Sequence, residues 1–157
     1  MRRRQYPSGE LSERSRSIAE ASAGWLHSLR DGAAGVSLTV RGGYNYATRR
    51  PDGDSGFFGA TAGFDYSFSD RVSAFAFADW ERNRFNAENV HFSADVLEDA
   101  VVLRRRDNLY QLGGGAVWGF AESWSLEPQI LYQHDESNVD DFDYSATEIW
   151  VNVRRSF

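Results

Sequence analysis

The sequence has no cysteine, no lysine and no long hydrophobic run. The absence of cysteine excludes disulfides, thiolate metal ligands and cysteine nucleophiles together. No segment approaches the roughly 18 consecutive apolar residues that a membrane-spanning helix needs. The basic start, Met1–Pro7, has no apolar stretch behind it and is therefore not a secretory signal peptide.

Clustered positive charge is also scarce. The chain has 17 basic and 23 acidic residues and a net charge of -6. Neutralising the phosphates of a nucleic acid requires clustered basic side chains. The two clusters present, Arg2–Arg4 and Arg104–Arg106, are short. This balance argues against nucleic acid as a partner.

Aromatic residues, by contrast, are abundant. Five Trp, seven Tyr and eleven Phe make up 15% of the chain, yet the mean hydropathy is -0.54. These two properties conflict in a soluble protein with a packed core. They agree in a transmembrane β-barrel, where alternate residues meet lipid and the others are polar.

Most of the chain alternates polar and apolar residues with a period of two. Such alternation is typical of β-strands whose two faces meet different media. In the last segment, for example, Ile149 and Val151 alternate with Glu148 and Asn152. The clearest segments are Ala34–Arg50, Gly56–Phe68, Asp107–Phe120, Trp124–Gln133 and Asp143–Phe157.

Two further segments are ambiguous. Residues Ser12–Leu29 fit an amphipathic helix as well as a strand. We favour a strand, because the neighbouring segments are strands and the period of two is kept. The segment Arg71–Phe85 contains two alternating sets of residues, one that ends in Trp80 and one that ends in Glu81. Both sets contain apolar residues, so either face of a strand here could be the apolar one.

Short and long connections alternate along the chain. Short connections rich in turn residues follow Leu29, Phe68 and Phe120. The longer, polar connections are Arg49–Gly56, Asn86–Arg106 and Asp135–Asp143. Outer-membrane barrels have this asymmetry, with tight periplasmic turns and longer outer loops.

The sequence therefore predicts an all-β fold, an antiparallel up-and-down transmembrane β-barrel or the C-terminal portion of one, with about seven to eight strands. Residues 1–11 would form a polar N-terminal segment and residues 12–157 the barrel region. Single-chain bacterial barrels normally have an even number of strands, and counting back from Phe157 gives about seven. We therefore expect an incomplete barrel, or a first strand that is shared or unusual. The missing signal peptide separately suggests a mature-form chain or one that lacks its natural N-terminal part.

Residue positions follow from this expectation. Charged residues on the polar faces would project into the barrel interior, either along a water-filled pore or in ion pairs that close a narrow barrel. They are Arg14, Arg16, Glu20, Arg41, Asp65, Glu127, Glu148 and Arg154. Aromatic residues near the strand ends would form two interfacial girdles. Phe68, Phe120, Trp124 and Phe157 border the short turns, and Tyr46, Phe58, Trp80, Tyr110 and Tyr132 lie toward the long loops.

The C-terminal part carries a succession of distinctive segments. They are Arg106-Asp-Asn-Leu-Tyr-Gln-Leu-Gly-Gly-Gly, Trp124-Ser-Leu-Glu-Pro-Gln-Ile-Leu-Tyr, and the ending Glu148-Ile-Trp-Val-Asn-Val-Arg-Arg-Ser-Phe157. This succession resembles the C-terminal porin-like β-barrel of outer-membrane proteins, and within them the surface lipoprotein assembly modifier family. The resemblance is strongest over residues 106–157. The family's helical repeat domain has no counterpart here.

The resemblance implies a location in the cell outer membrane and a role in bringing lipoproteins to the cell surface. It also implies that the barrel-assembly machinery reads the terminal aromatic, Phe157, as an assembly signal. Arg155 stands where an apolar residue is usual, and its side chain would extend to the interface. The expected partners are outer-membrane lipid and lipopolysaccharide, the assembly machinery through the C-terminal strand, and lipoprotein substrates.

Catalytic and metal chemistry have little support in the sequence. The three histidines, His27, His91 and His134, are not spaced as metal ligands. His134 has Asp135 and Ser137 nearby, but a triad within one loop base is geometrically unfavourable. The glycines at 113–115 lack the ending of a phosphate loop and lie in a strand pattern, where they would let the strand bend at a barrel wall or let a plug in the lumen approach closely. We expect no catalytic residue, no metal site and no cofactor.

The expected function is that of an integral outer-membrane β-barrel, which forms a pore or the membrane base of a surface lipoprotein export protein. Three alternatives remain at this point. A soluble lipocalin-like barrel also alternates polar and apolar residues. An outer-membrane enzyme would depend on His134, and an adhesin would bind a partner through residues 86–106.

Overall fold

The computed structural model describes residues 2–4, 16–47, 53–92 and 100–156 and places its strands in one antiparallel sheet. Within these residues the sheet has eight strands, and each strand pairs with its neighbours in the sequence. The predicted all-β, antiparallel up-and-down fold is confirmed. The strands are β1 (Arg2–Arg4), β2 (Arg16–Leu29), β3 (Ala34–Ala47), β4 (Ser55–Ser69), β5 (Val72–Phe92), β6 (Ala100–Ala121), β7 (Trp124–Ser137) and β8 (Tyr144–Arg155).

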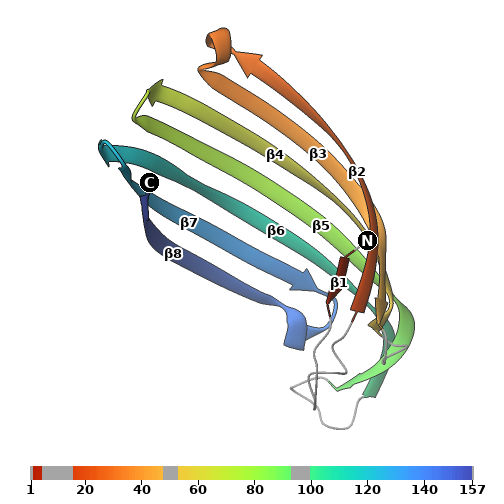
Figure 1. Ribbon diagram of the computed structural model, residues 1–157. Helices are drawn as coiled ribbons and strands as arrows, with labels where there is room; N and C mark the ends of the chain where they lie inside the picture. The colour runs from red at the N-terminus through yellow and green to blue at the C-terminus, as the bar shows by residue number, and fades with distance from the viewer. Residues whose placement is uncertain (1, 5–15, 48–52, 93–99, 157) are drawn as a thin grey trace.

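The sheet is twisted and curved into a trough, with β2 and β8 on opposite sides of it (Figure 1). Among the described residues β8 pairs with β7 alone, and β2 pairs with β3 along its whole length and with β1 at one end. The sheet is therefore open in this part of the chain. It has the form of a section of barrel wall.

The segment that was ambiguous between helix and strand is a strand in its described part. β2 pairs with β3 from Arg16 opposite Ala47 to Leu29 opposite Ala34. A single turn, η2 (Arg30–Gly32), joins the two strands, and its three residues all have positive φ. Gly32, at φ 93°, is the residue best suited to that backbone.

The expectation of a long polar connection over Asn86–Arg106 was wrong. β5 continues to Phe92 and β6 begins at Ala100, and the two remain paired as far as Phe92 opposite Ala100. The register shifts between Arg84 and Glu88, as at a β-bulge. The strands were missed because polar and apolar residues do not alternate here: β6 begins with the apolar run 100–103, which three arginines, 104–106, follow.

The connection expected over Asp135–Asp143 is also shorter. β7 extends to Ser137, and a short turn, η4 (Asp140–Phe142), leads into β8. Val139 is buried beneath this turn at 6% exposure. Part of the third long connection, residues 48–52, lies outside the described residues.

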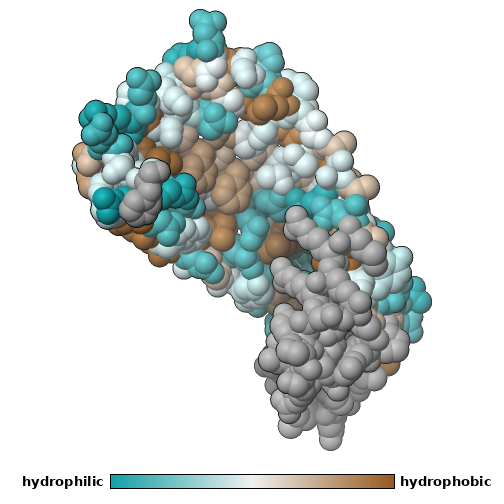
Figure 2. Space-filling model, in the orientation of Figure 1, coloured by the Kyte–Doolittle hydropathy of each residue, from teal (hydrophilic) through white to brown (hydrophobic). Residues whose placement is uncertain are grey.

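The two faces of the sheet differ in character. One face, here called the apolar face, carries large hydrophobic side chains that are exposed, such as Leu112 at 61% and Ile149 at 73%. The other, the polar face, lines the inside of the trough. Figure 2 shows a hollowed surface where hydrophilic and hydrophobic patches alternate. Ala34 and Val139 are the only buried hydrophobic residues among the described ones, so this part of the chain has no enclosed apolar core.

The strand register settles which face of β5 is apolar. Ala78 lies opposite Ala62 on β4 and Leu112 on β6, and Trp80 lies opposite Ala60 and Tyr110. The alternate set, which includes Phe75 and Phe77, therefore faces the inside of the trough.

Candidate functional site on the polar face

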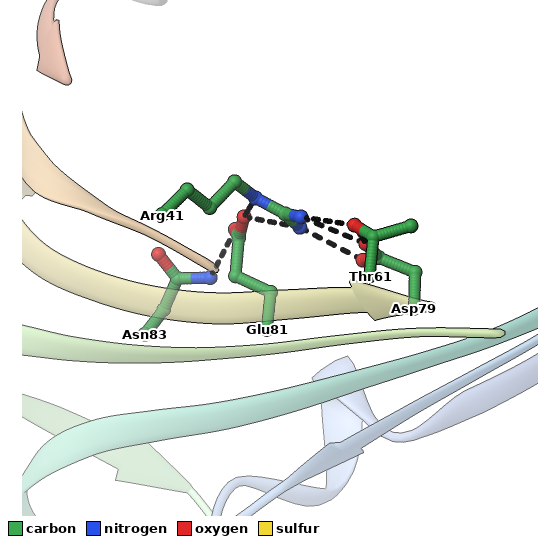
Figure 3. Close-up of polar contacts among 5 residues, drawn as sticks. All are labelled: Arg41, Thr61, Asp79, Glu81 and Asn83. Atoms are coloured by element: carbon green, nitrogen blue, oxygen red, sulfur yellow. Dashed lines mark hydrogen bonds and ion pairs between the residues drawn. The ribbon is translucent and has the colours of Figure 1, made fainter. Parts of the chain in front are cut away.

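A network of ionised side chains spans the polar face between β3 and β5 (Figure 3). The guanidinium of Arg41 donates to both carboxylate oxygens of Asp79, at 2.7 and 2.8 Å. It also donates to Oε2 of Glu81, at 3.1 Å from Nε and 3.0 Å from Nη2. Thr61, on the intervening β4, accepts from Arg41 at 2.9 Å and donates to Asp79. Asn83 donates to the second oxygen of Glu81 at 3.0 Å.

A glycine makes this network possible. Gly59 on β4 lies between Arg41 and Glu81 in the register. A Cβ at this position would lie 2.7 Å from the backbone oxygen of Trp80 and 3.1 Å from Cζ of Arg41. The missing side chain leaves the path across β4 open, so the guanidinium can reach β5.

The network is shielded and carries excess negative charge. The side chains of Arg41, Asp79 and Glu81 are 19%, 10% and 23% exposed. Charge-assisted, bidentate hydrogen bonds of this kind are among the strongest polar contacts in proteins. Two carboxylates face one guanidinium, so this band of the polar face has a net charge of about -1.

Aromatic rings cover glycines elsewhere on the same face. A Cβ at Gly113 would lie 2.5 Å from Cζ of Phe77, and one at Gly115 would lie 3.0 Å from Cζ of Phe75. The glycine run at 113–115 thus serves close ring packing between β5 and β6. This agrees with the sequence-based interpretation that these glycines allow a close approach, although the group that approaches comes from the adjacent strand.

A second charged group lies where the strands approach the long connections. The guanidinium of Arg105 lies 3.8 Å from the ring centre of Phe85 and 4.0 Å from that of Phe142 in η4. It pairs with Asp107 at 3.0 Å, and Asp107 accepts from Ser137 at 2.8 Å. A cavity of about 310 Å³ lies here, lined in part by Arg16, Glu20, Asn45, Glu81, Arg105 and Asp107.

The short-turn end of the trough also contains a cavity. A cavity of about 750 Å³ is lined there by small polar residues that include Ser67, Ser73 and Ser125. Nearby, Glu127 is 7% exposed and pairs with Arg154 at 3.4 Å. Polar and charged groups thus lie at both ends and in the middle of the trough, with the rings of Phe75 and Phe77 among them.

Seven of the eight charged residues singled out from the sequence fall on the polar face, and Arg14 lies outside the described residues. The structure brings Arg16 and Glu20 to one cavity and pairs Glu127 with Arg154. It places Asp65 beside Gly35, opposite Phe75, and Glu148 opposite Leu131. The sequence reasoning missed Asp79, Glu81, Arg105 and Asp107. The first two lie in the segment whose faces were ambiguous, and the other two lie in or beside the expected connection.

Of the aromatic residues singled out, Phe68, Phe120, Trp124 and Tyr46 lie near strand ends, but Trp80 and Tyr110 lie in the middle of β5 and β6, because these two strands extend further than expected. Toward the short turns, Phe68 contacts Tyr66, Phe120 contacts Trp118, and Trp124 lies 5.3 Å from the guanidinium of Arg155. Toward the long connections, Trp80 packs edge-on against Phe58 with ring centres 6.0 Å apart. Tyr46 and Tyr132 are 49% and 45% exposed. Phe157, the expected assembly signal, lies outside the described residues.

No family model matches the chain, and no curated protein or solved structure matches it. The described residues contain no helix long and apolar enough to cross a membrane. They also contain no group of three or more His, Asp or Glu side chains that could hold a metal ion.

Proposed function

We propose that this chain forms part of the wall of a porin-like β-barrel in the bacterial outer membrane. The apolar face would contact lipid and the polar face would line a water-filled lumen. One observation carries this proposal: large hydrophobic side chains are exposed along one face of the long strands, while partly buried ion pairs occupy the other.

The physical argument rests on the cost of the exposed surface. Each Å² of apolar surface left in water costs about 25 cal/mol relative to burial. Large contiguous apolar patches that are exposed on a protein mark interaction or membrane surfaces. A bilayer removes this cost, and the long strands, of 12 to 22 residues, exceed the roughly 9–11 residues that a tilted membrane strand needs.

The polar face supports passage of water and small polar solutes. Fixed ion pairs and polar side chains at the wall of a trough are typical of a barrel interior. The excess negative charge of the Arg41 network favours cations over anions at that level. We infer no catalytic step.

A more specific role as the membrane base for lipoprotein export rests on the sequence resemblance alone. In that role the partners would be outer-membrane lipid and lipopolysaccharide, the barrel-assembly machinery acting on β8 and Phe157, and lipoprotein clients. No nucleic acid, metal or cofactor enters the proposal.

Site-directed spin labelling tests the proposal directly, because the chain contains no cysteine. Leu112 and Gln111 are adjacent in β6 and lie on opposite faces. We expect a label at Leu112→Cys, in lipid vesicles, to collide more with oxygen than with a water-soluble nickel complex. A label at Gln111→Cys should show the reverse order.

A second pair on β7, Ile130→Cys and Gln129→Cys, repeats the comparison on another strand. Equal accessibility at both members of each pair would contradict the proposal. A chain that is monodisperse in buffer without detergent would also contradict it and would favour a soluble ligand-binding barrel.

A further inference from the structure

A groove crosses the apolar face of β4, β5 and β6. It has a volume of about 480 Å³. Three alanines, Ala60, Ala62 and Ala78, contribute to its lining beside much larger side chains. The large residues that line it are Leu38, Trp80, Tyr110, Leu112 and Tyr132. The contrast between small and large side chains makes a channel in the surface that would face hydrocarbon.

Three arginines continue the same face toward the long-connection end. Trp80 lies opposite Tyr110, the next pair on that face is Arg82 opposite Asn108, and the pair after it is Arg84 opposite Arg106. Successive pairs on one face are about 6.7 Å apart along the strands. Arg82, Arg84 and Arg106, here called the arginine cluster, therefore begin one step beyond the aromatic end of the groove.

Few described groups neutralise the arginine cluster. Nε of Arg82 is buried and has no hydrogen-bond partner among the described residues. Two described carboxylates lie close to the cluster in the register. Glu136 accepts from Asn108 and Tyr110 at 3.5 Å, and Asp54, which precedes the Gly56 opposite Arg84, accepts from the backbone N–H of Ala47 at 2.7 Å. Further out, Arg104 and Glu88 form a pair at 3.3 Å. The cluster thus keeps a net positive charge beside an apolar groove.

We propose that the groove and the arginine cluster together bind one molecule of lipid A, the phosphorylated anchor of lipopolysaccharide. An acyl chain would lie in the groove, and a phosphate would accept hydrogen bonds from the cluster. Guanidinium groups match phosphate oxygens in geometry, and Trp80 and Tyr110 lie between the two parts, as rings at a headgroup boundary do. The inference rests on the proposed function and on the usual orientation of outer-membrane barrels, in which the longer connections lie at the outer leaflet where lipid A resides.

The test is a lipid titration of the detergent-solubilised full chain, read by native mass spectrometry. Lipid A is compared with phosphatidylglycerol, which carries one phosphodiester. We expect tighter retention of lipid A. The variant Arg84→Gln/Arg106→Gln should raise the half-saturating lipid A concentration about thirtyfold, as expected for two arginines at a membrane surface. Both side chains are exposed, so folding should survive.

The charge-matched control is Arg30→Gln/Arg71→Gln, at the short-turn end, which should leave lipid A retention unchanged. Ala78→Leu should weaken retention by filling the groove, whereas Ala21→Leu on the same face of β2 should not.

Equal retention of the two lipids, or equal losses in the cluster variant and its control, would overturn the inference. The spin-label result tests membrane insertion separately, so a chain that inserts but does not select lipid A refutes only this inference.

Discussion

At the scale of single residues, Arg41 is the side chain on which the polar face depends most clearly. Replacing it in Arg41→Met leaves Asp79 and Glu81 close together without their shared cation. Breaking a shielded ion pair from one side is costly because the remaining charges stay poorly solvated. We expect a loss of about 2 kcal/mol in the free energy of unfolding, measured by urea denaturation of the refolded chain in detergent.

Arg154→Met is the matched control. The side chain of Arg154 is 71% exposed, although it pairs with Glu127. Removing this exposed ion pair should change the free energy of unfolding by less than about 1 kcal/mol. Combining Arg41→Met with Asp79→Asn and Glu81→Gln should recover part of the loss, because no unpaired charge remains. Equal effects of the two arginine substitutions would show that the Arg41 network is not structural.

The sequence predicts the face on which Arg41 lies but not its partners. Alternation in residues 34–50 is clear, so the inward position of Arg41 follows from the sequence alone. Asp79 and Glu81 share their face with Phe75 and Phe77, and that mixture hides the period. The partners become evident only from the register that places Gly59 between Arg41 and Glu81.

At the scale of elements, Arg105 holds the β7–β8 connection, which includes η4, against the sheet. Its guanidinium lies between Phe85 of β5 and Phe142 of η4 and pairs with Asp107 of its own strand. In Arg105→Ala the stack is lost, and a shielded cation–π contact contributes about 1–2 kcal/mol. We expect hydrogen exchange of residues 138–143 to speed up by roughly tenfold.

Arg104→Ala supplies the control one position away. Arg104 is 61% exposed and pairs with Glu88, away from η4. Its substitution should leave exchange in residues 138–143 unchanged. If Arg105→Ala also has no effect there, other contacts hold the connection, for example those of Asn138 with the backbone of Arg104 and Arg106.

The sequence predicts a strand wherever the two faces of that strand meet different surroundings, because its residues then alternate in polarity. The segments that became β3, β4, β7 and β8 have clear alternation, and their bounds fall within a few residues of the expected ones. The outer halves of β5 and β6 carry Glu88 and Arg104 where apolar residues would continue the pattern. The pairing of these two strands comes from backbone hydrogen bonds, which leave no trace in side-chain hydropathy.

At the scale of the whole molecule, strand direction limits how the open sheet can be completed. Strands alternate in direction from β2 to β8, so these two edge strands run the same way. Any strand that pairs antiparallel with both must run opposite to them, as β1 already does at one end of β2. Antiparallel closure therefore requires an odd number of strands between β8 and β2. A second copy in the same orientation would bring its β2 parallel to β8, and only its β1, at one end of that β2, would run antiparallel to β8.

Disulfide trapping in the cysteine-free chain tests whether β2 and β8 meet directly. Leu26 of β2 lies opposite Ser37 of β3 and is 70% exposed. Opposed residues of antiparallel strands satisfy the Cα separation of a disulfide, so Leu26→Cys with Ser37→Cys should oxidise readily. Leu26→Cys combined in turn with Glu148→Cys, Trp150→Cys or Asn152→Cys of β8 should stay reduced within one chain. Efficient intramolecular cross-linking of any β8 variant would mean that β2 and β8 meet in parallel, and the trough would then be a closed barrel of this chain alone.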